Sequence, residues 1–189
     1  MLFRSIYLFP KVGDCSGGTI IADCPNASLK LKTNIYLHDV EVKNLSALVA
    51  YNDVNFNKLT INNTGVYSAQ GNQLTIREAF VNHNNQSDDP LNKVSQGFVP
   101  GSESQLTLFE GSDMTYEGIG NFATQFGMLK VDGNLSLVSG CSPIRVAGDL
   151  TQISGVVSDN GYVFYYFLYE ISNHNARLYY YSIHPKKHN

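Results

Sequence analysis

Leu129-Lys-Val131 and Leu135-Ser-Leu137, separated by Asp-Gly-Asn, are the clearest examples of a pattern that recurs through this 189-residue sequence. In each run an aliphatic residue alternates with a polar one, which is the period of a β-strand with one buried face. The same alternation predicts further short strands, which begin at Leu29, Val40, Leu59, Leu74, Leu106 and Leu150. The sequence therefore predicts an all-β protein built from half-buried strands.

The spacing of these strands indicates how they are arranged. Leu59 follows Val40, Leu129 follows Leu106 and Leu150 follows Leu129 at similar intervals, whereas the step from Leu59 to Leu74 is shorter. Near-regular steps are typical of a solenoid, in which each coil supplies two or three strands that stack on the next coil as parallel sheets. We therefore expect a parallel β-solenoid. An antiparallel β-sandwich is the alternative, because its short strands also recur, at intervals of about 8 to 12 residues.

Asparagine and glycine fill the segments between the strands. Asn takes a left-handed backbone conformation at low cost, and Gly does so without any steric penalty. Asn-rich corners favour stacked coils over hairpins. The corner residues that we expect are Asn44, Asn57, Asn62, Asn63, Asn72 and Asn134, with Gly65, Gly71, Gly133, Gly140, Gly148, Gly155 and Gly161.

Two segments depart from the repeat. Residues 82–104 are polar, contain Pro90 and Pro100, and predict a loop that protrudes from the body and is either flexible or functional. Residues 161–183 contain two aromatic runs around a polar turn, which predicts an antiparallel hairpin. We expect this hairpin to cap an end of the solenoid or to meet another chain, within a single domain of residues 1–189.

Composition and charge argue against binding to nucleic acid or spanning a membrane. Charged residues make up 15% of the chain and the net charge is -3, so the basic surface that nucleic acid requires is missing. No apolar stretch reaches the roughly 18 residues of a transmembrane helix. Residues 1–10 predict a first strand, with the remnant of a secretory leader as the alternative. A cytoplasmic location is slightly favoured over a secreted or cell-surface one.

No motif for a cofactor or for nucleophilic catalysis is present. Gly118-Ile-Gly120 lacks the third glycine of a dinucleotide site, and no nucleophile elbow or reactive-cysteine signature accompanies the histidines and cysteines. Cys15, Cys24 and Cys141 predict buried thiols, with a Cys15–Cys24 disulfide as the alternative. We expect no cofactor.

Carboxylates make the strongest case for an enzyme, because glycoside hydrolysis requires two acidic groups that face each other. The candidates are Asp88, Asp89, Asp113, Glu117 and Asp132. Aspartate is an ordinary turn residue, so we expect these groups to be solvated and non-catalytic. Asp88 and Asp89 also lack the spaced oxygen ligands of a calcium loop, and no metal site is expected.

The candidate interaction surface combines aromatic and acidic side chains. Tyrosine rings stack on sugars, although packing within the hairpin is the simpler expectation for those near the C-terminus. The surface comprises Tyr165, Tyr166, Tyr169, Tyr179 and Tyr181, with Asp88 and Asp89 from the polar loop.

Residues 128–140 (Met-Leu-Lys-Val-Asp-Gly-Asn-Leu-Ser-Leu-Val-Ser-Gly) and 144–153 (Ile-Arg-Val-Ala-Gly-Asp-Leu-Thr-Gln-Ile) resemble the coils of bactofilins. They are also similar to the passenger regions of bacterial autotransporter adhesins. The resemblance implies a right-handed parallel β-helix, and the bactofilin likeness implies a non-enzymatic, nucleotide-independent scaffold that assembles end to end. Uneven coils, the polar loop and the aromatic hairpin depart from the bactofilin pattern.

Three functions follow from these observations. The first is a non-enzymatic structural or interaction protein that binds copies of itself or another protein. The second is a surface or secreted carbohydrate-binding or adhesive module, which would contact a glycan through residues 82–104 and the tyrosines. The third is a polysaccharide-degrading enzyme.

Overall fold

The computed structural model describes residues 5–8, 17–87, 94–119, 122–138, 141–158, 165–172 and 175–181, with the backbone alone for β1, β16 and β17. These residues form strands and turns, and none lies in a helix that could cross a membrane. A long sheet contains β2 (Thr19–Ala22), β4 (Ile35–Val42), β6 (Val54–Ile61), β8 (Leu74–Asn82), β10 (Leu106–Gly118), β12 (Met128–Leu137) and β14 (Leu150–Ser154), with β15 (Val157–Ser158) also paired to β12. A short sheet contains β1 (Ser5–Leu8), β3 (Ser28–Leu31), β5 (Ala47–Ala50), β7 (Val66–Ser68) and β9 (Phe98–Val99). A third sheet contains β11 (Thr124–Phe126), β13 (Ile144–Val146), β16 (Tyr165–Ser172) and β17 (Asn175–Tyr181).

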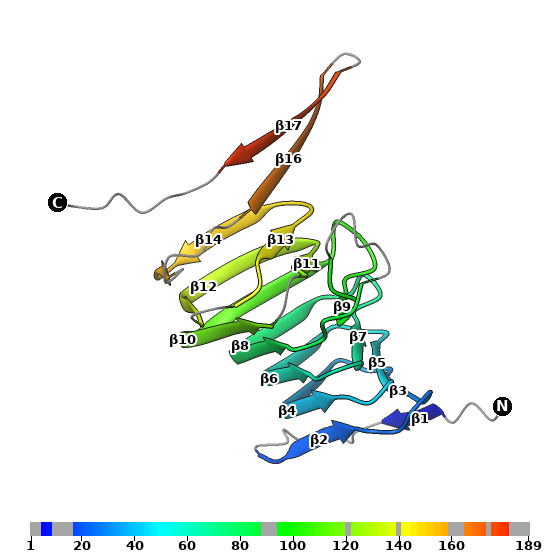
Figure 1. The fold of residues 1–189 in the computed structure, drawn as a ribbon. Coiled ribbons are helices and arrows are strands. Elements are labelled where there is room, and N and C mark those ends of the chain that lie inside the picture. Colours follow the sequence, from blue (N-terminus) through cyan, green and yellow to red (C-terminus); the bar gives the residue numbers. More distant parts are fainter. Residues whose placement is uncertain are drawn as a thin grey trace.

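The chain alternates between the long sheet and the other two as it climbs the stack (Figure 1). β4 is followed by β5 of the short sheet, β6 returns to the long sheet beside β4, and later coils repeat this path. Neighbouring strands in the long and short sheets pair in parallel. The fold is therefore a parallel β-solenoid of about six turns, as predicted. The antiparallel sandwich is wrong, because its sheets would pair their neighbours in the opposite sense.

The length of one coil follows from the register of the long sheet. Ile35 lies beside Val54 in the next coil, and Val54 in turn lies beside Leu74. The shorter step from Leu59 to Leu74 is not a coil, because Leu59 lies beside Phe80. These two leucines occupy different halves of the coil, which the sequence pattern does not distinguish.

Each long strand bends near its middle, so that it supplies two inward-facing runs. In β4, Leu37 and Val40 are both buried although they are three residues apart, so the alternation slips at His38-Asp39. The register also shifts near the middle of the β6–β8 and β10–β12 pairs. A register shift of this kind is produced by an extra residue in one strand. The extra residue bends the strand and changes the direction of the side chains that follow it. One coil therefore closes around the core on three sides, with β5 or its equivalent as the third.

In the later coils the bend is built from a column of glycines. Gly111, Gly133 and Gly155 follow one another at a constant interval in the sequence. A Cβ on Gly133 would lie 1.7 Å from the Gly111 carbonyl oxygen, and one on Gly155 would lie 2.1 Å from the Gly133 carbonyl oxygen. Gly133 and Gly155 also have φ angles of +128° and +74°. Backbone therefore packs on backbone at this corner, which requires glycine.

The corner residues fall partly as predicted. Asn44 and Asn63 adopt φ angles of +54° and +52°, and Gly71 one of +81°, which confirms them as left-handed corners. Asn57 and Asn134 are not corners between strands, because they lie within β6 and β12. Both stand at or near the bend of a long strand, where the sequence gives the same polar signal as a turn. The predicted corners at Gly140 and Gly161 lie outside the described residues.

The core is aliphatic in the early coils and aromatic in the middle ones. The rings of Phe80, Phe98 and Phe126 are fully buried and contact one another with centroids 5.1 to 5.5 Å apart. Complete burial of one such ring stabilises a fold by about 1.5–3 kcal/mol. The central coils therefore hold a cluster of contacting aromatic rings in the core.

Residues 82–104 do not form one protruding loop, and that prediction is wrong. Phe98 is buried in the aromatic core and begins β9, which pairs with β7. Asn82, Asn84 and Ser95 are buried as well. The polar composition of this segment indicated solvent, whereas part of it forms a hydrogen-bonded interior.

The C-terminal segment contains the predicted antiparallel hairpin. β16 joins the third sheet beside β13, and β17 pairs with β16 in the antiparallel sense. The hairpin projects beyond the last coil of the stack (Figure 1). It thus extends the third sheet, while β14 ends the long sheet.

Candidate functional site

The long sheet ends in strands that are paired on one side. Within the described chain, β2 pairs with β4 alone, and β14 and β15 pair with β12 alone. The outer backbone edges of these strands present peptide groups without a strand partner among the described residues. Such edges are templates for pairing with another strand.

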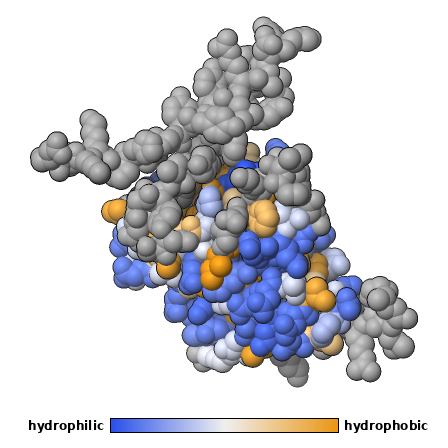
Figure 2. All heavy atoms as spheres, in the orientation of Figure 1, coloured by the Kyte–Doolittle hydropathy of each residue, from blue (hydrophilic) through white to orange (hydrophobic). Residues whose placement is uncertain are grey.

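Aliphatic side chains are exposed in the end coil. Ile153 and Val156 are 56% and 64% exposed, while Leu150 and Val157 of the same coil pack partly against the core. On the face visible in Figure 2, hydrophilic residues dominate and hydrophobic ones form small separate groups.

Polar contacts hold this end coil in register with the one below. The Ser154 hydroxyl donates to Asp132 Oδ1 at 2.5 Å, and the Val156 amide donates to Asn134 Oδ1 at 3.1 Å. The Leu135 amide donates to the Val156 carbonyl at 2.9 Å. β14 and β15 therefore form an ordered edge that is fixed from one side.

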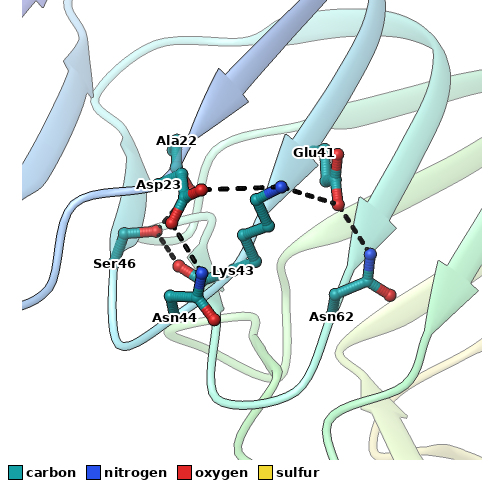
Figure 3. A network of polar contacts seen from close by, with 7 residues as sticks. All are labelled: Ala22, Asp23, Glu41, Lys43, Asn44, Ser46 and Asn62. Atoms are coloured by element: carbon teal, nitrogen blue, oxygen red, sulfur yellow. Dashed lines mark hydrogen bonds and ion pairs between the residues drawn. The ribbon is translucent and has the colours of Figure 1, made fainter.

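A comparable network fixes the first described coil (Figure 3). Asn44 Nδ2 donates to Asp23 Oδ1 at 2.7 Å, and the Lys43 ammonium lies 3.5 Å from Asp23 Oδ2 and 3.8 Å from Glu41 Oε1. Asn62 Nδ2 donates to Glu41 Oε1 at 2.7 Å, which carries the network into the next coil. Asp23 directly follows β2, so these contacts hold the strand at the other edge of the long sheet.

The predicted carboxylates are placed in contacts between coils. Glu117 lies 2.9 Å from His83 Nε2, and Asp132 accepts the hydrogen bond from Ser154. Asp113 is exposed at the bend of β10 beside Asn134. The contacts of Glu117 and Asp132 join successive coils.

The cysteines differ from the prediction in one case. Cys141 is buried, and this burial raises the pKa of its thiol. Cys24 is an exposed free thiol, so its predicted burial is wrong. Cys15 lies outside the described residues. Across the parts of the chain that the structure describes, no group of three or more acidic, His or Cys side chains is arranged to hold a metal ion.

The predicted interaction residues are only partly described. The backbones of Tyr165, Tyr166 and Tyr169 lie in β16, and those of Tyr179 and Tyr181 in β17. Tyr166 is in register with Tyr181 across the hairpin. The side chains of these tyrosines, and Asp88 and Asp89 altogether, lie outside the described residues.

A polar network inside the stack was missed by sequence reasoning. Asn82 Nδ2 donates to Thr124 Oγ1 at 2.8 Å and to Ser95 Oγ at 3.3 Å, and the Tyr116 hydroxyl donates to Thr124 Oγ1 at 2.9 Å. Burial raises the pKa of Tyr116 to about 12. The network lies between β8 and β9, where it supplies partners for the backbone N–H groups of Asn84 and Gly97.

Sequence reasoning also missed a polar groove on the outer surface of β4, β6 and β8. Its lining includes Tyr36, Asn55 and Thr75, which lie side by side in three successive coils. The nearly equal spacing of these three positions in the sequence is the signal that could have identified it.

Comparison with known proteins found no family model, no curated protein and no solved structure that matches the chain.

Proposed function

We propose that this protein is a non-enzymatic structural module that associates with further copies of itself end to end, as the bactofilin-like coils imply. The observation that carries the proposal is that the long sheet, within the described part of the chain, has an unpaired strand edge at each end. β2 forms one edge, and β14 with β15 forms the other. Both ends are held in register by polar contacts to the neighbouring coil. Each edge is therefore ordered and can pair with a strand of another copy.

The composition of these edges supports pairing. Natural edge strands are usually protected by charged residues or proline. β2 reads Thr-Ile-Ile-Ala, β14 reads Leu-Thr-Gln-Ile-Ser and β15 reads Val-Ser, without a charge or a proline. A second copy that placed its β2 beside β14 would continue the parallel sheet and cover Ile153.

Contact between two different surfaces of the same chain is heterologous, and it propagates into an open filament unless the rotation closes a ring. Solenoid coils stack with nearly constant geometry. End-to-end addition therefore favours a filament whose long sheet runs through successive copies. The carboxylates Glu117 and Asp132 contact neighbouring coils, which supports a structural role for them rather than a catalytic one.

Sedimentation of the full chain over a concentration series, with negative-stain images of the same samples, tests this proposal. We expect a concentration-dependent series of species and filaments. Ile153→Lys places a charge on the exposed edge and should weaken association by about tenfold or more.

The matched control is Leu45→Lys, because Leu45 is 55% exposed and lies in a turn at the side of the stack. It should assemble like the unaltered chain. A monodisperse monomer at every concentration, or equal weakening by both variants, would reject end-to-end association.

A further inference from the structure

The groove across β4, β6 and β8 is a second feature of the surface, and it is independent of the ends of the stack. It has a volume of about 300 Å³. Its polar lining consists of Asn34, Tyr36, Asp53, Asn55, Gln73 and Thr75. Each coil contributes one residue just before its long strand and one from within that strand. The groove is therefore a repeated unit rather than a chance depression between two loops.

The lining side chains are held by contacts with one another and with their neighbours. The Tyr36 hydroxyl donates to Asn57 Oδ1 at 2.5 Å, and Arg77 Nε donates to Asn55 Oδ1 at 3.2 Å. The Gln73 backbone N–H donates to Asp53 Oδ1 at 2.8 Å, and the Gln73 side chain donates through Nε2 to Thr75 Oγ1 at 3.2 Å. Fixed side chains lose little conformational entropy on binding, which favours a ligand that meets them as they stand.

The hydrogen-bonding capacity of this lining defines the chemistry of its ligand. Asn and Gln amides each offer donors and an acceptor, and Asp53 adds a carboxylate. Tyr36 adds an aromatic ring of the kind that stacks on apolar ligand faces. No lysine or arginine is among the lining residues, and Arg77, which donates to Asn55, is paired with Glu110 at 3.5 Å. An anionic ligand would therefore meet the Asp53 carboxylate without an unpaired cation beside it. The groove suits a neutral ligand rich in hydroxyl groups.

The repeat along the groove adds a constraint on the shape of that ligand. Adjacent parallel strands lie about 4.8 Å apart, so Asn34, Asp53 and Gln73, one from each coil, place polar groups at about that interval along the stack. Thr75 is buried and accepts a hydrogen bond from Gln73 Nε2 at 3.2 Å. A ligand with hydroxyl groups repeated along its length matches this array. Because β4, β6 and β8 are each paired on both sides, they offer no free edge to an extended peptide.

We propose that the groove formed by Tyr36, Asp53, Asn55, Gln73 and their neighbours binds a neutral oligosaccharide chain that lies along the stack. The sugar hydroxyls bond to the amides and to the Asp53 carboxylate, while one sugar face stacks on the Tyr36 ring. This site lies on the flank of the solenoid, so sugar binding there and end-to-end association can be tested independently.

Titration of the full chain with neutral tetrasaccharides of glucose, xylose and mannose, followed by NMR shifts and calorimetry, tests the site. Oligogalacturonate serves as the anionic comparison. We expect at least one neutral probe to bind saturably and oligogalacturonate to bind more weakly. Tyr36→Ala should weaken binding by about tenfold, which is the loss of one aromatic contact and its hydrogen bond.

Tyr51→Ala is the matched control, because Tyr51 is an exposed tyrosine outside the groove. It should leave binding unchanged. Asp53 is also exposed, so Asp53→Ala provides a second groove variant that tests the site if Tyr36→Ala fails to fold. The absence of saturable binding to every neutral probe, a preference for oligogalacturonate, or equal binding by Asp53→Ala and the unaltered chain would overturn the proposal.

Discussion

Ile61 and Asn82 occupy the same position in adjacent coils, yet one belongs to an apolar interior and the other to a polar one. They lie side by side in the β6–β8 pair, and both are buried. Ile61 is part of the hydrophobic core, while Asn82 bonds to Ser95 and Thr124. The coil geometry therefore encloses either kind of side chain, provided that each polar atom finds a partner.

The polar interior has a specific cause in the path of the chain. Asn84 and Gly97 lie between β8 and β9 and outside any strand, so their peptide groups need partners other than a neighbouring strand. The Asn84 backbone N–H donates to Asn82 Oδ1, and the Gly97 backbone N–H donates to Ser95 Oγ. In the coils around Ile61 the backbone groups bond directly to neighbouring strands, so the interior needs no polar side chains and is filled by aliphatic ones.

Exchanging the two side chains gives the largest expected effect. Ile61→Asn buries an amide in the apolar region and should lower the free energy of unfolding by about 4 kcal/mol. Asn82→Ile leaves the partners of Asn82 unsatisfied and should lower it by about 3 kcal/mol. Urea denaturation measures both. An Asn82→Ile variant as stable as the unaltered chain would contradict the role of the network.

Alkaline pH should lower the free energy of unfolding, because the pKa values of two tyrosines are higher in the folded state than in the unfolded state. Burial raises the pKa of Tyr116 from 10.0 to about 12 and raises that of Tyr67 further. Below pH 10 both states keep these protons, and stability is unaffected. Between pH 10 and 12 the unfolded chain loses them first, so the free energy of unfolding should fall by about 1.4 kcal/mol per pH unit for each tyrosine.

Denaturation curves at pH 9 to 12 for the unaltered chain and for Tyr116→Phe test this expectation. The difference in pH dependence between the unaltered chain and the variant reports the ionisation of Tyr116 alone, because the lysines and the other tyrosines are present in both. The variant should lose stability less steeply. Parallel pH profiles would show that Tyr116 ionises equally in both states.

The two hydroxyls give the smallest expected effects, and these have opposite signs. Tyr116 donates to Thr124, so Tyr116→Phe should lower the free energy of unfolding by about 1 kcal/mol. The Tyr67 hydroxyl is buried without a hydrogen-bond partner among the described residues, so Tyr67→Phe should raise it by about 1 kcal/mol. Thermal and urea unfolding near pH 7 measure both changes. Destabilisation by Tyr67→Phe would indicate a partner for that hydroxyl.

Much of the fold could be predicted because strand alternation is a local property. Leu129 and Val131, or Leu59 and Ile61, face inward simply because they are two residues apart in a strand that buries one face. The coil length was harder, since the bend within each long strand places Leu59 and Leu74 in different halves of a coil. The constant interval in the glycine column Gly111, Gly133 and Gly155 carries that information.

The candidate surfaces could not be predicted from the same pattern. Leu129 and Leu150 lie side by side in adjacent coils, but Leu129 is covered by a further coil and fully buried, whereas Leu150 belongs to the last coil of the long sheet and is partly exposed. The lining of the groove likewise comes from residues that are a full coil apart in the sequence. Position in the stack, rather than local sequence, determines which residues are exposed together.

The sequence by itself determined the β-strands, the solenoid class and several of the left-handed corners, because these depend on alternation and on the backbone preferences of neighbouring residues. Tertiary structure alone decided that Asn82 is buried, that Phe98 returns to the core, and that Ile153 is left at an open edge. The physical reason is that burial depends on what the adjacent coil supplies, a strand, a hydrogen-bond partner or nothing, and that neighbour lies a full coil away along the chain.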